Sequence, residues 1–336
     1  MAAQAGWYAV RLRQELILRN RTFARGRAHV ESYGIVPVVV YEPENGRHGN
    51  FFDESYAAIA ANPDWMRRFD KIHAQAARSL PKPRLEHSRR WRELDSSMSS
   101  DALLMNIFCA PGVAESRAVR DALGIDDSPL PPAFGWKARV PLANGRFDRT
   151  EVDMRFGSLL VEAKLTEVGF QSRAAAIVEA YRDFDNVFDR DLLPRVEIAT
   201  ARWMRASEFP ENESQELESV IGDPDSFSAI DASFRAPGEE GYASYQLIRN
   251  VLAAHAEGCS FCVFLDERRP DLREEWFQVM AAVKTAAMRV RLKVLTWQEL
   301  AALLPGALQE FLDLKYGIVA PGKTPSPIEG VAENPD

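Results

Sequence analysis

Two acids and one lysine in the middle of the chain have types and spacing that could do chemistry together. Asp153 lies in RTEVDMRF, and Glu162 and Lys164 lie in LLVEAKLT, with Gly157-Ser158 between the two segments. A Gly-Ser pair between two alternating segments predicts a β-hairpin with a two-residue turn. In that register Asp153 is directly opposite Glu162, and Glu151 is opposite Lys164. The period of two keeps all four side chains on one face.

The other face of this hairpin is apolar and is formed by Val152, Met154, Phe156, Leu159, Val161 and Ala163. Directly opposed carboxylates destabilise a hairpin unless a cation lies between them. Mg²⁺, with Mn²⁺ as an alternative, suits such a pair because hard cations take carboxylate oxygens and keep positions for water and phosphate. Lys164 would place an ammonium where charge develops on the phosphate. The pattern predicts a phosphodiester-cleaving site with Asp153 and Glu162 as metal ligands and Lys164 as a catalytic residue.

The use of lysine at this place strengthens the interpretation. Of the 41 basic residues only 8 are lysine, and Glu162-Ala163-Lys164 is the one Glu-x-Lys triplet in the sequence. A compact ammonium with an adjustable pKa suits a position beside a metal. The structural alternative is a solvent-exposed hairpin face on which Glu151 pairs with Lys164 and the two acids tolerate each other in water.

The flanking segments predict an α/β fold around the hairpin. Ser100 and Asp101 are capping residues for an apolar helix, and Asn144-Gly145 is a second hairpin turn that makes FGWKARVPLANGRFDRTEVDMRFGSLLVEAKLT a three-stranded meander. The pattern then predicts a helix at about 171–190, a strand in VEIATARW, a helix in YASYQLIRNVLAAHAEG, a strand in CSFCVFL, a helix over 272–289 and a strand in RLKVLTW.

Asp153, followed by Glu162-Ala163-Lys164 on the next strand, resembles the PD-(D/E)xK nuclease superfamily of restriction-endonuclease-like proteins. The resemblance implies an αβββαβ core with a mixed sheet flanked by helices, over residues 99–303. It implies that Asp153 and Glu162 bind Mg²⁺, with the Ala163 carbonyl as a further ligand, and that Lys164 orients or activates water. Val152 stands where the family's motif has proline.

Two further roles are implied by the same resemblance. Exonuclease-like branches carry a glutamine on the helix after the Glu-x-Lys strand, and Gln246 in YQLIRN is similar to it, with Asn250 where those branches often have tyrosine. An acid on the first core helix supports the metal in many members. Asp101 or Glu115 could take that place.

The predicted organisation places a basic, mainly helical extension at 1–98 before the nuclease-like core at 99–303, which carries an insertion at about 191–240. A closing helix at 304–316 and a disordered tail at 317–336 follow. Only three cysteines occur; Cys259 and Cys262 fall on opposite faces of one strand and are predicted to be buried hydrophobes.

Charge is distributed unevenly along the chain. Residues 1–92 carry 16 Lys and Arg against 9 Asp and Glu, whereas the remainder carries 25 against 40, so the net charge of -8 hides a basic N-terminal part. This asymmetry predicts that nucleic acid, DNA in the first place, binds through the basic segment that contains Arg84, Arg89, Arg90 and Arg92. The alternative is a solvated arginine-rich surface.

The sequence therefore favours a metal-dependent nuclease that hydrolyses DNA. The alternative is a nuclease-fold protein that binds nucleic acid or a protein partner without catalysis. No basic leader and no apolar run of about 18 residues occurs, which predicts a cytoplasmic protein without membrane contact. No glycine-rich phosphate loop is present, so no nucleotide cofactor is expected. A homodimer is one arrangement that the sequence leaves open.

Overall fold

A five-stranded mixed sheet forms the centre of the computed structural model, which describes residues 2–32, 37–71, 92–126, 130–198 and 239–328. The strand order is β12-β11-β7-β6-β5. Strands β5, β6 and β7 are antiparallel, and β7, β11 and β12 are parallel. Their bounds are Ala133–Pro141 (β5), Phe147–Phe156 (β6), Leu159–Ala163 (β7), Ser260–Leu265 (β11) and Leu292–Thr296 (β12). The predicted meander and the mixed sheet are confirmed.

Glycine sets both turns of the meander. Gly145 and Gly157 have φ values of 80° and 57°, which a residue without Cβ adopts at little cost. The β6–β7 register is the predicted one, with Phe156 opposite Leu159 and Met154 opposite Val161. The ladder ends there, however, so the predicted direct pairing of Asp153 with Glu162 does not form.

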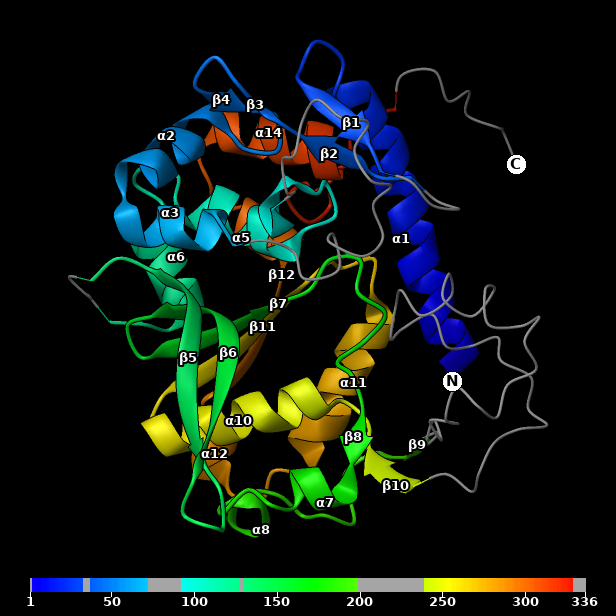
Figure 1. Cartoon of the computed structure of the whole chain (residues 1–336), viewed down its shortest axis with the longest axis vertical. Helices are drawn as coiled ribbons and strands as arrows, with labels where there is room; N and C mark the ends of the chain where they lie inside the picture. The colour runs from blue at the N-terminus through cyan, green and yellow to red at the C-terminus, as the bar shows by residue number, and fades with distance from the viewer. Residues whose placement is uncertain (1, 33–36, 72–91, 127–129, 199–238, 329–336) are drawn as a thin grey trace, which may run out of the picture.

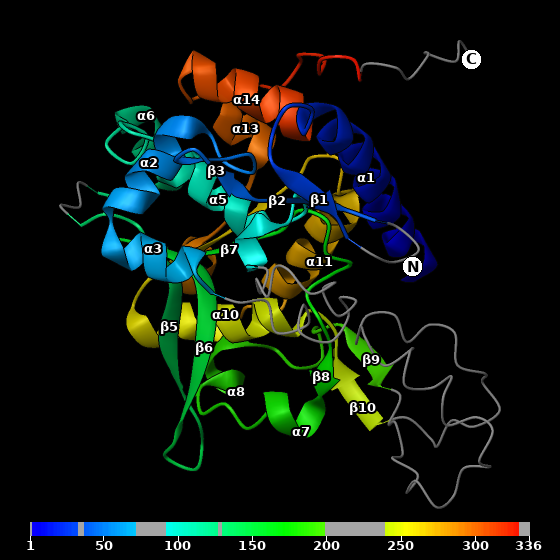
Figure 2. The same cartoon turned by 45° about the horizontal axis from the view of Figure 1, so that its top comes forward.

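Helices cover both faces of the sheet (Figures 1 and 2). One face packs against a core shared by α5, α6, α13 and α14, and the other against a core shared by α10, α11 and α12. Cys259 is buried in the second core and Cys262 in the first, as predicted. The helix bounds are Ser100–Phe108 (α5), Arg117–Leu123 (α6), Tyr245–Glu257 (α10), Pro270–Ala281 (α11), Ala286–Arg289 (α12), Trp297–Ala301 (α13) and Gly306–Tyr316 (α14).

The N-terminal segment packs directly on the nuclease-like core. Leu12 and Leu16 of α1 belong to the same apolar cluster as Met154 and Val161 of the sheet. Phe69 of α3 packs with residues of α5 in a separate small cluster. The bounds are Ala2–Phe23 (α1), His29–Glu31 (β1), Val39–Tyr41 (β2), Pro43–Glu44 (β3), Arg47–His48 (β4), Asp53–Ala61 (α2), Pro63–Phe69 (α3) and Glu93–Asp95 (the 3₁₀ helix η1).

The helix predicted at about 171–190 is wrong. The segment contains a two-residue strand and two single helical turns, because the backbone between the two turns bonds to the meander and interrupts the helix. Arg182 N–H donates to the Pro141 carbonyl at 3.0 Å, and Ala143 N–H donates to the Ala180 carbonyl at 2.9 Å. The bounds are Arg173–Ala174 (β8), Ala175–Val178 (α7) and Phe184–Val187 (α8).

Strands β9 (Arg195–Ile198) and β10 (Glu239–Tyr242) complete a second, three-stranded sheet with β8. Most of the insertion predicted at about 191–240 lies outside the described residues. In the segment predicted as a tail, Ile318 is buried and the Ser326 hydroxyl donates to Asp313 at 2.7 Å. Within the described parts of the chain, no helix is long and apolar enough to cross a membrane.

Lys315 on α14 gives a prediction about stability. It is fully buried, its ammonium donates to Asn20 Oδ1 at 2.7 Å, and burial, with Arg27 nearby, holds its pKa well below the usual range. Between that lowered value and the unfolded value of about 10.4, the unfolded chain binds the proton and the native state does not, so stability rises with pH. Replacing Lys315 by Met should remove this dependence, so that the variant gains most over the wild type at low pH.

Thermal melts of both proteins from pH 6 to pH 10 check this expectation. The difference in melting temperature between Lys315→Met and the wild type should shrink as pH rises. A difference that stays constant over the range would mean that Lys315 keeps its proton in the fold.

Candidate active site

Asp153 leaves the regular sheet at a bend in β6. The β5–β6 ladder omits Gly135 and Asp153, which lie between two regular pairs, and Gly135 has a φ of 62°. Val152 packs in the α10-side core while Met154 packs in the α5-side core, so side-chain alternation breaks between them. The prediction that Val152 shares the face of Met154 is therefore wrong. The bend lets Asp153 Oδ2 accept a hydrogen bond from Ala163 N–H of β7 at 2.7 Å, beyond the end of the ladder.

Glu162 and Lys164 meet at the end of β7. Glu162 is buried, and its Oε1 accepts from the Lys164 ammonium at 2.8 Å. Lys164 N–H donates to the Phe264 carbonyl at 2.8 Å, and Trp297 Nε1–H donates to the Lys164 carbonyl at 2.9 Å. These bonds fix the backbone from which the lysine projects. In Figure 1, β7 lies between α5 above it and α10 below it.

The predicted pairing of Glu151 with Lys164 does not form either. Glu151 Oε1 accepts from the Lys71 ammonium at 2.6 Å, and it lies 3.6 Å from Arg68 Nη1. The solvent-exposed alternative also fails for Glu162 and Lys164, since both are buried. An ion pair of this kind loses much of its hydration, so it indicates a specific role more than a gain in stability.

Electrostatics at the site favour a protonated lysine beside an excess of acid. Burial and the negative charges of Glu162 and Asp101 hold the pKa of Asp153 well above its usual range, and Lys164 only partly opposes this. Burial alone would lower the pKa of Lys164, but Glu162, Glu167 and Asp153 outweigh it and raise that pKa above its ordinary value. In the metal-free protein these shifts favour a proton on Asp153 and the ammonium form of Lys164, and both reduce the negative charge that the acids would otherwise gather at the site.

Asn250 of α10 is a site residue that was not predicted. It is fully buried, and its Nδ2 donates to Glu162 Oε2 at 2.7 Å. Gln246 lies one helical turn earlier, on the same face of α10. The oxygens Asn250 Oδ1 and Gln246 Oε1 are buried and have no partner in the described structure. Buried acceptors of this kind call for a donor such as water.

A second charged cluster joins α3 and α5 beside Asp153. The Arg68 guanidinium bonds to the Asp101 carboxylate and lies 3.4 Å from Glu93. Burial, with Glu93 and Glu167 nearby, raises the pKa of Asp101 to about 6, although Arg68 lowers it. Of the two helix acids named from the sequence, Asp101 thus lies close enough to Asp153 to raise its pKa, whereas Glu115 is exposed before α6.

The oxygen donors of β6 and β7 could hold a hard divalent cation. Asp153 and Glu162 offer carboxylates, and the Ala163 carbonyl points to the same side of β7 as its N–H, toward Asp153. Among the described residues, no group of three or more His, Cys, Asp or Glu side chains is placed to hold a metal ion. Mg²⁺ typically takes one or two protein carboxylates and fills its other positions with water and phosphate, so this donor set fits it.

The arginines predicted to bind nucleic acid are described only in part. Arg84, Arg89 and Arg90 lie outside the described residues. The Arg92 guanidinium lies 3.3 Å from Asp70 and 4.5 Å from the centre of the Phe69 ring. The Arg92 side chain therefore contacts residues at the end of α3.

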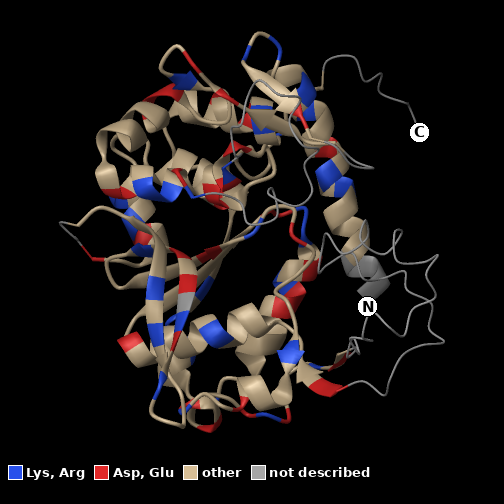
Figure 3. Cartoon of the chain, viewed as in Figure 1, with Lys and Arg blue, Asp and Glu red and all other residues tan. Residues whose placement is uncertain are grey.

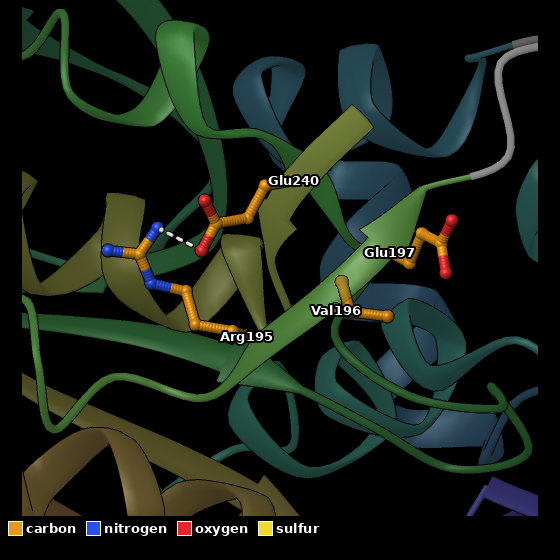
Figure 4. A pocket seen from close by; sticks show the side chains of 4 residues that line it. All are labelled: Arg195, Val196, Glu197 and Glu240. Atoms are coloured by element: carbon orange, nitrogen blue, oxygen red, sulfur yellow. Dashed lines mark ion pairs between the residues drawn. The ribbon is translucent and has the colours of Figure 1, made fainter. Parts of the chain in front are cut away.

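A surface pocket elsewhere lacks comparable chemistry. It is lined by Arg195, Val196, Glu197 and Glu240 of β9 and β10, where Arg195 and Glu240 form an ion pair at 3.2 Å (Figure 4). It lies on the small second sheet. We therefore take the Asp153 site as the candidate active site.

Comparison with known families agrees with the fold. The sequence model of a family described as "Restriction Endonuclease associating with ARP" matches residues 18–317. The chain belongs to this family. The matched residues include α3, the meander, α10 and α14, so the elements that carry Arg68, Asp153, Glu162 and Asn250 all lie within the part of the chain that the family model covers. The comparisons with curated proteins and with solved structures gave no match.

Asn250 gives the second prediction. Leucine has nearly the same shape but cannot donate to Glu162, so Asn250→Leu should leave Glu162 Oε2 without its partner. Loss of such an orienting contact typically costs about 10- to 100-fold in metal affinity or activity. The Mg²⁺ concentration needed for half-maximal cleavage should rise by about that factor, measured by plasmid cleavage over a metal titration.

Asn20→Leu is the matched control for this variant, because Asn20 is also a fully buried helical asparagine, but its amide donates to the Leu16 and Lys315 carbonyls and not to Glu162. Equal Mg²⁺ dependence for Asn250→Leu and the wild type would show that the amide contact is only structural.

Proposed function

We propose that this member of the restriction-endonuclease family is a Mg²⁺-dependent nuclease that hydrolyses phosphodiester bonds of DNA. The observation that carries the proposal is the group formed by Asp153, Glu162 and Lys164 at the end of β7. Asp153 bonds the backbone of the residue between the other two, and Glu162 and Lys164 form a buried ion pair. A family match over residues 18–317 supports a nuclease as the kind of protein.

Each residue has a role that follows from its surroundings. The raised pKa of Lys164 keeps its ammonium protonated at neutral pH, so it stabilises negative charge as the phosphate is attacked and does not take up a proton. Asp153 and Glu162 would hold the cation, with the Ala163 carbonyl beside them. A bound Mg²⁺ lowers the pKa of water and neutralises charge on the phosphate. Asn250 keeps Glu162 oriented through its amide.

The role of the buried acceptors follows from the same geometry. Asn250 Oδ1 and Gln246 Oε1 have no donor within the described structure. A water held by one of these oxygens is restricted in orientation, which favours one line of attack on the phosphate. Gln246 would therefore be a positioning residue of the site.

Incubation with supercoiled plasmid and with single-stranded DNA tests the proposal. Cleavage should occur with Mg²⁺ or Mn²⁺ and stop with EDTA, and an RNA of matched length shows whether the substrate is DNA. Failure of the protein to cut any of these nucleic acids with either metal, while it still binds them, would favour the alternative of a binding protein without catalysis.

A further inference from the structure

Strands β5 and β6 present a basic outer surface beside the site. Lys137, Arg139 and Arg149 are exposed, and so is Arg146 after the turn. The register places Arg139 directly opposite Arg149 and Lys137 opposite Glu151. Basic residues are visible on both strands in Figure 3. We call the exposed side chains of Lys137, Arg139, Arg146 and Arg149 the hairpin arm.

The arginine pair in the hairpin arm lacks an acidic partner in the described structure. Like charges directly opposite each other destabilise an antiparallel pair. Within the described residues, neither Arg139 nor Arg149 forms an ion pair, and the nearby acids are engaged elsewhere. Asp148 accepts from the Tyr181 hydroxyl at 2.6 Å, and Glu151 from Lys71 at 2.6 Å. A bound anion would offset the repulsion.

Two exposed aromatic rings hold arginines on this hairpin. Arg139 lies over Phe147 with 4.3 Å to the ring centre, and Arg155 lies over Trp136 with 4.7 Å. Arg155 donates to Glu257 at 3.0 Å, whereas the stacked Arg139 guanidinium can present its N–H edge to phosphate oxygens. Stacking also reduces the conformational freedom that binding must remove. Phe147 is 47% exposed and Trp136 is 36% exposed, so these stacks stand at the surface.

A simpler explanation is protection of a sheet edge. β5 is the last strand of the five-stranded sheet, and charged residues on an edge strand prevent pairing with another chain. That explanation accounts for Lys137 and Arg139 on β5. It gives no reason for Arg149, which stands on the inner strand β6 and faces Arg139.

We propose that the hairpin arm binds the phosphate backbone of the nucleic acid that the Asp153 site cleaves. This inference rests on the proposed nuclease function. Arg149 is four residues from Asp153 along β6, or about 13 Å at strand spacing. One base pair advances about 3.4 Å along duplex DNA, so the arm contacts phosphates about four base pairs from the scissile bond. The contact is to the backbone and is independent of base sequence.

A salt titration of binding tests the arm. Anisotropy of a labelled 30-base-pair duplex is measured in EDTA, so that no cleavage occurs, at several salt concentrations. The double variant Arg139→Gln, Arg149→Gln should bind DNA more weakly. The magnitude of its slope of log affinity against log salt should fall by about two, since each lost phosphate contact lowers that slope by about one. Arg139→Lys with Arg149→Lys keeps both charges and should retain the wild-type slope.

Arg21→Gln with Arg117→Gln is the matched control, because it removes the same charge from exposed positions on α1 and α6. Melting curves verify that every variant is folded. If the double glutamine variant binds DNA with the wild-type salt slope while the wild type cleaves DNA, the proposed role of the hairpin arm is wrong and the nuclease proposal stands. Self-association of the glutamine pair with unchanged binding would assign the arginines to edge protection. If the wild type neither binds nor cleaves DNA, both proposals fail.

Discussion

Replacing Lys164 by Met should reduce DNA cleavage by at least about 10²- to 10³-fold, the usual cost of removing one group that stabilises transition-state charge. Methionine fills most of the same buried volume, so the loss of cleavage activity measures the contribution of the ammonium group. The affinity for DNA, measured in EDTA, should change little. Lys164 is buried, so it contributes little to the surface that DNA contacts in the absence of metal. Initial rates of plasmid nicking and anisotropy of a labelled duplex measure the two quantities.

Lys315→Met is the matched control for this experiment. It removes another fully buried lysine, on α14, away from the Asp153 site, and should leave cleavage near the wild-type rate. Lys164→Met should also lower the stability of the metal-free protein by about 3–5 kcal/mol, because Glu162 loses the partner of a buried ion pair. Cleavage by folded Lys164→Met at the wild-type rate would remove the lysine from the mechanism.

Asp153→Asn should have opposite effects on the metal-free and metal-bound protein. Without metal, the asparagine oxygen can still accept from Ala163 N–H, and the repulsion from Glu162 and Asp101 disappears. The variant should therefore be as stable as the wild type or more stable. With Mg²⁺ the wild type should melt at a higher temperature by mass action, whereas the variant should show little metal-dependent shift and no cleavage.

The stability of the metal-free protein should depend on pH through Asp153. Its native pKa is raised above the unfolded value of about 3.9, so the native state holds the extra proton between the two values. Stability must then fall as pH rises through the native pKa, and Asp153→Asn should not show that fall. Melts in EDTA across pH 5 to 8 measure it. A variant that is much less stable than the wild type at every pH, or one that keeps the Mg²⁺ shift, would make Asp153 a structural residue.

Local patterns in the sequence were sufficient to predict the strands of the meander and to identify Asp153 and Glu162 as candidate site residues. Two glycine-containing turns and the alternation around them determine which residues of β6 and β7 pair, and that register holds from Phe156 to Met154. Beyond Met154 the β6–β7 ladder stops beside a bend near Gly135 of β5, and an isolated glycine within a strand is only a weak signal of such a bend. The sequence therefore predicted that Asp153 pairs directly with Glu162, whereas in the structure Asp153 bonds to the backbone of Ala163.

The residues that were missed come from distant parts of the chain. Arg68 reaches Asp101 from α3, and no spacing rule connects two positions on separate helices. Asn250 had a detectable pattern, since it stands one helical turn after Gln246 on the face that turns toward Glu162. The missed break at 171–190 has the same origin. Its apolar spacing suits a helix, but backbone bonds to Pro141 and Ala143 decide its conformation.

The bonds at Lys164 also determine when this part of the molecule can open. Its N–H is held by Phe264 and its carbonyl by Trp297, and all five residues of β7 are buried between two strands. Amide hydrogens in such a strand exchange with solvent only when the whole fold is lost. Hydrogen exchange at the Lys164 amide should therefore report the global free energy of unfolding, and every local opening on the surface should leave β7 intact.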